Sequence, residues 1–156
     1  MTNNPSQKMR STPVGEAFER TGIRVPELAK AVGIGEASCF DLLEHEDELT
    51  SCLTLRQVSR LAGVLRVPVV MLLEDPPAPA KARRSFGDLA EAILQFCEAQ
   101  KLTVEQFGDD ANWDVQPFLK APDSALDGWC LDTLMEVCEA LDLHWPDYLP
   151  DAAKAG

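Results

Sequence analysis

Cys39, His45 and Cys52 are of residue types that bind metal ions, because thiolate and imidazole groups are the usual zinc ligands. A fourth ligand at a suitable spacing is missing, and none of the five cysteines forms a C-x-x-C pair. The odd number of cysteines also argues against a framework of disulfides. The pattern therefore predicts free thiols that pack as small apolar groups, with no metal ion and no cofactor.

Catalytic patterns do not stand out either. We find no nucleophile–base arrangement, no glycine-rich phosphate loop and no paired-carboxylate motif. The many Asp and Glu residues are best interpreted as solvated faces. We therefore expect a protein without enzymatic activity.

The charge of the chain is strongly negative and unevenly distributed. The formal net charge is −12 over 156 residues; residues 1–75 carry −3, residues 76–85 carry +3 and residues 86–156 carry −12. Nucleic-acid binding gains affinity from counterion release by Lys and Arg, so the second half as a whole is expected to repel nucleic acid. No apolar run approaches the about 20 residues of a membrane span, and residues 1–11 lack the apolar core of a signal peptide. The expected location is the cytoplasm, without membrane contact.

Helix signals divide the first half into five short helices. Thr12 and Pro13 mark a helix start, Gly22 and Gly33 mark helix ends, and Thr54 begins a capping box. The expected helices cover about residues 12–22, 24–33, 35–44, 54–65 and 68–73, with an acidic loop before the fourth. Residues 1–11 are expected to be disordered.

The second half repeats the apolar spacing of the first. Residues 102–107 match residues 23–28 at an offset of 79, whereas residues 131–149 match residues 55–73 at an offset of 76. The loop between the third and fourth helices is therefore expected to be three residues shorter in the second copy. A pattern shared over the whole unit indicates an internal duplication, and the proline-rich residues 76–84 indicate a semi-rigid linker.

Leu28-Ala29-x-x-Val32-Gly33-Ile34, followed by Leu61-Ala62-x-x-Leu65-x-Val67-Pro68, resembles the Xre family of phage-repressor (Cro-like) helix-turn-helix domains. The first copy, residues 12–75, matches clearly. The second, residues 85–151, is degenerate because Asn112 stands at the position of the turn glycine and Gly108 at that of the small alanine. The resemblance implies an all-α fold, a tandem of two five-helix lambda-repressor-like helix-turn-helix domains, followed by a tail at residues 152–156.

In that family the second helix of the motif lies in the major groove, and side chains near its start reach base edges. Useful readers are Arg, Lys, Asn and Gln, because they pair with guanine or adenine edges. The corresponding positions of the first copy are Glu36, Ala37, Ser38, Phe40 and Asp41. Those of the second copy are Val115, Gln116, Pro117, Leu119 and Lys120, where Pro117 is expected to shorten the helix.

Phe40 and Leu119 occupy matching positions that the family leaves polar and exposed, and Leu43 adds an apolar group near Phe40. Apolar residues with acidic neighbours on a prominent helix suggest a protein-binding surface. That surface is expected to comprise Glu36, Phe40, Asp41, Leu43, Val115 and Leu119. The alternative is that the helix is rotated and the apolar residues pack in the core.

Two functional hypotheses follow. The first is a regulatory protein that binds another protein, such as an antitoxin, immunity protein, antirepressor or DNA mimic, with a basic partner suited to its acidity. The alternative is a DNA-binding transcriptional regulator that uses the first domain, with contacts from Arg10, Arg24, Ser38 and Arg56. The acidic second domain would then serve dimerisation or effector binding. A homodimer is compatible with both hypotheses.

Overall fold

The computed structural model describes residues 12–149, and this part of the chain is helical without any β-strand. The expected all-α class is therefore confirmed. The expectations for residues 1–11 and 152–156, and for Arg10, lie outside the described residues. The first half contains α2 (Pro13–Thr21), α3 (Val25–Val32), α4 (Glu36–Glu44), the π-helical turn η1 (Glu48–Cys52), α5 (Leu55–Leu65) and the 3₁₀ turn η2 (Val69–Leu72).

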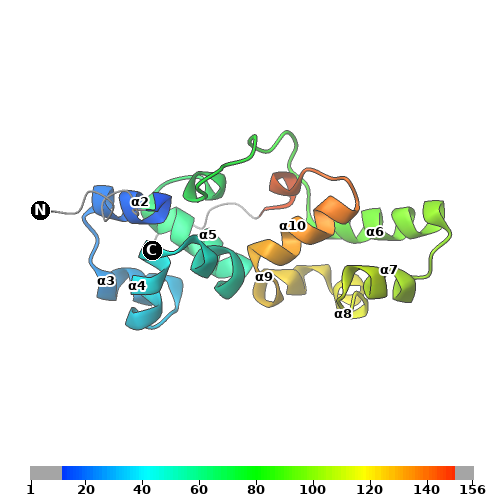
Figure 1. Ribbon diagram of the computed structural model, residues 1–156, viewed down its shortest axis with the longest axis horizontal. Helices are drawn as coiled ribbons and strands as arrows, with labels where there is room; N and C mark the ends of the chain where they lie inside the picture. Colours follow the sequence, from blue (N-terminus) through cyan, green and yellow to red (C-terminus); the bar gives the residue numbers. More distant parts are fainter. Residues whose placement is uncertain (1–11, 150–156) are drawn as a thin grey trace, which may run out of the picture.

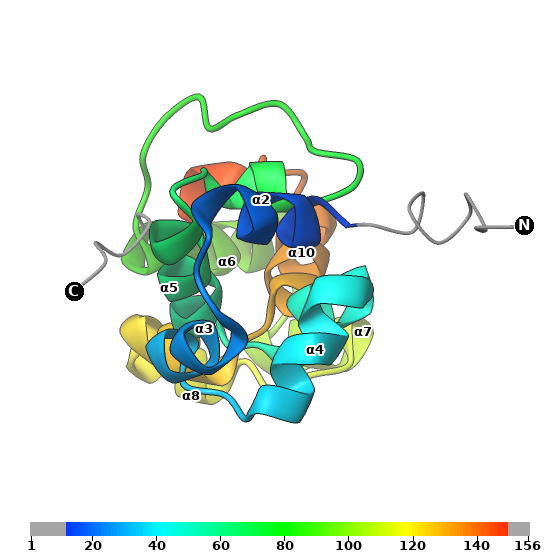
Figure 2. The same ribbon diagram turned by 90° about the vertical axis from the view of Figure 1, so that its left-hand side faces the viewer.

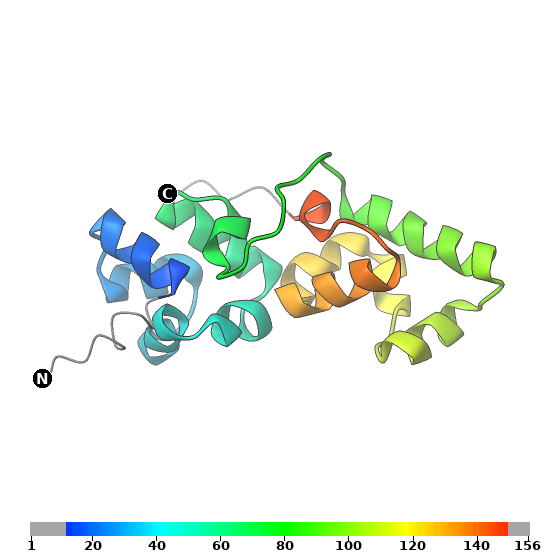
Figure 3. The same cartoon turned by 45° about the horizontal axis from the view of Figure 1, so that its top comes forward.

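The second half follows the linker in a similar order (Figure 1). It contains α6 (Phe86–Gln100), α7 (Val104–Ala111), α8 (Gln116–Lys120), the 3₁₀ turn η3 (Pro122–Ser124), α9 (Ala125–Gly128), α10 (Leu131–Ala140) and the 3₁₀ turn η4 (Trp145–Tyr148). The two halves lie end to end, each at one end of the long axis of the molecule (Figures 1 and 3).

Side-chain caps fix the starts of several helices. The Thr12 hydroxyl accepts a hydrogen bond from Gly15 N at 3.0 Å and donates one to Leu43 O at 2.7 Å, so it also joins the start of α2 to the end of α4. The predicted capping box at the start of α5 is present: Gln57 N donates to Thr54 Oγ1, and Thr54 N donates to Gln57 Oε1. Such caps satisfy amide groups that the first helical turn leaves without a partner.

Two expected elements of the first half take a different form. The acidic segment before α5 was expected to be a loop, but it contains η1, in which Leu49 is completely buried. The predicted fifth helix is only a 3₁₀ turn. The physical reason for the first difference is the burial of Leu49 and Leu53. Both side chains lie in the core, and removing them from water favours a segment that packs against the rest of the protein.

The backbone makes left-handed turns at matching places in the two halves. The residues with positive φ form three pairs, at offsets of 79, 79 and 76: Gly22 with Lys101, Gly33 with Asn112, and Arg66 with Asp142. The first pair ends α2 and α6, the second ends α3 and α7, and the third follows α5 and α10. Left-handed residues end many helices, so the distinguishing feature of this chain is that they recur at the offsets of the matching apolar residues.

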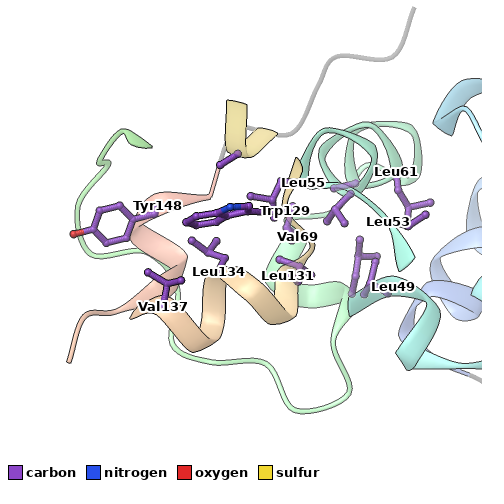
Figure 4. Packing of buried hydrophobic residues seen from close by; sticks show 14 of the residues in the cluster. Leu49, Leu53, Leu55, Leu61, Val69, Trp129, Leu131, Leu134, Val137 and Tyr148 are labelled. Carbon is purple, nitrogen blue, oxygen red and sulfur yellow. The ribbon is translucent and has the colours of Figure 1, made fainter. Parts of the chain in front are cut away.

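The two halves share one apolar core. Leu49 of the first half lies beside Leu131 of the second, and Leu55 lies beside Trp129 (Figure 4). At the offset of 76, η1 corresponds to α9 and α5 corresponds to α10. The contacts between the halves are therefore reciprocal, since α5 packs against α9 while α10 packs against η1. Leu55 N also donates a hydrogen bond to Trp129 O at 2.9 Å.

The linker is held against the second half. Asp147 Oδ1 accepts hydrogen bonds from Lys81 N and Ala82 N, at 2.8 and 3.3 Å, and Asp147 O accepts one from Arg84 N. The linker and α4 lie on opposite sides of the molecule (Figures 1 and 2). The basic residues of the linker are therefore remote from the acidic α4.

Candidate functional site

The outward side of α4 is the strongest candidate for a binding surface. Cys39 and Leu42 are 0% and 1% exposed and attach the helix to the core, whereas Phe40 is 53% exposed. Phe40 therefore points outward, and the alternative of a rotated helix does not apply to it. It is among the few large apolar side chains that the described residues leave exposed, and the others, Met71 and Leu94, lie on η2 and α6.

Carboxylates surround Phe40 on this side. Glu36, Asp41 and Glu44 are all exposed, and within residues 12–149 no ion pair involves any of them. Burial raises the pKa of the Cys39 thiol, and the charge of Glu36 raises it further. The surface combines one exposed aromatic ring with unpaired negative charge.

Leu43 contributes less to this surface than expected. It is half-buried and packs against the core, and its carbonyl oxygen accepts the hydrogen bond from Thr12. The exposed part of the surface is therefore formed by Glu36, Phe40, Asp41 and Glu44.

The third helix of the second half does not offer an equivalent surface. Val115, predicted to contact a partner, is only 2% exposed and lies in the core, so this part of the prediction is wrong. Leu119 is half-buried against the core. The α8 helix has five residues with Pro117 in its first turn, which agrees with the shortening expected there.

Gly108 explains how Val115 becomes buried. A Cβ atom at Gly108 would lie 2.7 Å from Trp113 O and 3.8 Å from Val115 N. The missing side chain thus lets the segment that leads into α8 pack directly on α7. Ala29, the matching residue of the first half, carries a Cβ atom.

Three of the residues predicted to contact DNA, Arg24, Ser38 and Arg56, lie within the described residues. Arg24 and Ser38 are exposed on α3 and α4, at the N-cap and in the first turn respectively. The Arg56 guanidinium instead binds Asp127 in the other half through two hydrogen bonds, of 2.6 and 3.0 Å. The hydrogen bond from Arg56 lowers the pKa of the Asp127 carboxyl group.

An aromatic cluster in the second half was missed by the sequence interpretation. The rings of Trp113, Phe118 and Trp129 contact one another, with centroids 4.5 to 6.3 Å apart. The sequence did contain a signal for this cluster, because Trp113 and Phe118 occupy the positions that match Ile34 and Cys39 in the apolar pattern of the first half. A hollow beside Trp113 is lined by Glu105, Asp109, Asp114 and Gln116.

Within residues 12–149, no group of three or more His, Cys, Asp or Glu side chains is placed to hold a metal ion. Cys39 is buried as expected of a free thiol that packs as a small apolar group, whereas Cys52 is exposed and does not follow that expectation. In the same range, no helix has the length and apolar character needed to cross a membrane.

Comparison with known protein families, with curated proteins and with solved structures gave no match.

Proposed function

We propose that the protein is a non-enzymatic regulatory protein, built as a tandem of two Xre-like helix-turn-helix units, which acts by binding another protein. An antitoxin, immunity protein, antirepressor or DNA mimic would act in this way. The observation that carries the proposal is the outward side of α4, where Phe40 is 53% exposed between acidic residues. In a helix-turn-helix protein this is the side that would meet the bases.

The tandem arrangement is supported by two independent features. The three pairs of left-handed residues recur at the same offsets as the apolar residues. The contacts between the halves are also reciprocal, because η1, shifted by 76 residues, falls on α9, and α5 falls on α10. Reciprocal contact of equivalent elements is typical of a two-fold dimer, which supports the proposal that the chain contains two related units.

Protein binding is favoured over base readout by the charges on α4. A carboxylate at contact distance from a phosphate costs on the order of 1 kcal/mol in water and more when desolvated. No Lys or Arg occurs between Lys30 and Arg56 to offset this cost. Phe40 gains nothing from the DNA backbone, but it can bury its ring against an apolar side chain of a protein.

A DNA-binding measurement at low salt tests the proposal. Fluorescence anisotropy with a labelled random-sequence duplex at about 50 mM salt should show no binding by this protein. The result is informative because even non-specific DNA-binding proteins bind strongly at such low salt. The double substitution Glu36→Lys and Asp41→Lys is the matched control. It should create salt-sensitive binding if acidity is what prevents the α4 side from meeting DNA. Salt-sensitive binding by the unmodified protein would refute the proposal and favour the transcriptional regulator.

A further inference from the structure

Glu36, Phe40 and Glu44 form a row along the exposed side of α4 that turns by about 40° around the helix axis at each step. They are four residues apart, and an α-helix rises 1.5 Å per residue, so successive members are separated by about 6 Å along the axis. All three side chains are exposed. We call these three residues the α4 row.

The α4 row has a definite chemical complement. Its centre is an aromatic ring that needs an apolar side chain to cover it, and its two ends are carboxylates without an ion-pair partner among the described residues. The complement is an apolar residue with a cation about 6 Å away on each side. Arg suits the ends particularly well, since its guanidinium binds a carboxylate through two hydrogen bonds and also stacks on aromatic rings.

A helix supplies this pattern with the same periodicity. Residues four apart lie on one face of a helix, so Arg-x-x-x-Leu-x-x-x-Arg presents cation, apolar group and cation at the spacing of the α4 row. A second copy of this chain would bring the same negative charges to the contact and is therefore disfavoured.

We infer that the α4 row is a docking site for a basic amphipathic helix of another protein, with one apolar side chain placed between two Lys or Arg residues. This inference rests on the proposed function and names the class of partner. Phe40 supplies the apolar anchor, while Glu36 and Glu44 fix the register of the bound helix by charge.

The test uses synthetic alanine-rich helical peptides and the ¹⁵N-labelled full-length protein. The first peptide carries Arg-x-x-x-Leu-x-x-x-Arg, the second has Ala in place of Leu, and the third has Glu in place of both Arg residues. Chemical-shift changes in NMR titrations to millimolar peptide should concentrate on α4 for the first peptide. The second should bind more weakly, and the third should not bind.

Two sets of protein variants separate the contribution of the Phe40 ring to binding from that of the two carboxylates. Phe40→Asp should weaken binding of the first peptide by about tenfold, as loss of an aromatic anchor does. Met71→Asp is the matched control, because Met71 is equally exposed at 55% but lies on η2, and it should leave the affinity unchanged. Glu36→Gln with Glu44→Gln, which preserves the shape and the ring, should weaken binding and reduce its dependence on salt.

The inference is overturned if the first peptide causes no shifts on α4, or if the second or third peptide binds as tightly as the first. It is also overturned if Phe40→Asp and Met71→Asp have equal effects. If one of these outcomes is observed and the protein still does not bind DNA at low salt, the docking inference fails but the proposed function stands. Salt-sensitive DNA binding by the unmodified protein would instead remove the proposed function itself.

Discussion

Replacing Gly108 with alanine tests how the second half is packed. Gly108 is buried within α7, and its carbonyl oxygen accepts a hydrogen bond from Trp113 N at 3.0 Å. A Cβ atom would lie 2.7 Å from Trp113 O, which belongs to the backbone and cannot swing aside as a side chain could. The segment that leads into α8 must therefore move away from α7.

Two opposing effects set the magnitude. Alanine is favoured over glycine inside a helix by about 0.8–1 kcal/mol. Overpacking that forces backbone shifts costs about 1–3 kcal/mol. The steric cost should dominate, because the contact is well inside the van der Waals distance, and we expect Gly108→Ala to lower the free energy of unfolding by about 1–2 kcal/mol.

Urea unfolding followed by circular dichroism measures this difference. Gly87→Ala is the matched control, since Gly87 is exposed in the first turn of α6 and its added Cβ would meet nothing closer than Ser85 Oγ at 3.5 Å. That change should raise the free energy of unfolding by up to about 1 kcal/mol. If Gly108→Ala stabilises the protein as Gly87→Ala does, the close approach of Trp113 to α7 is wrong.

Three further predictions concern backbone strain, thiol reactivity and pH. Lys101→Gly and Asp142→Gly should each raise the free energy of unfolding by about 0.5–1 kcal/mol in urea titrations, because both residues have positive φ. Cys52 is exposed and should react rapidly with a thiol reagent at pH 8, whereas Cys39 and Cys138 should react only after unfolding. Burial and the charge of Asp147 raise the pKa of Cys138 from 9.0 to about 12, so the folded state retains a proton that the unfolded state releases. The free energy of unfolding should therefore keep the full contribution of this protonated thiol below pH 9 and lose it as the pH rises toward 12. Urea midpoints across this range would measure the loss.

The local signals in the sequence predicted most helix boundaries of the first half. Thr12, Gly22, Gly33 and Thr54 stand at the helix ends where they were expected. These signals succeed because a cap or a left-handed turn depends on residues close in the chain. The left-handed conformation of Asn112 follows the same logic, since asparagine tolerates positive φ better than most residues.

The features that the sequence could not supply depend on contacts between distant residues. Val115 is buried because a backbone segment approaches Gly108, and apolar spacing alone does not show that approach. The pairing of Arg56 with Asp127 joins residues of different halves. The outward direction of Phe40 was left open because it depends on Cys39 and Leu42 occupying the inward positions of α4.

The differences between the halves suggest a division of roles. In the second half, Trp113 and Phe118 stand where the first has Ile34 and Cys39. The Phe118 ring stacks on Trp129 and the Trp113 ring meets Trp129 edge to face, near the contact with the first half. The third helix of that half is short, and its start is buried. In the first half, the small thiol of Cys39 fills the inward position, and α4 remains long enough to carry Phe40 between two carboxylates. In the proposed tandem, α4 of the first half would therefore contact the partner, whereas the start of the corresponding helix of the second half packs into the core.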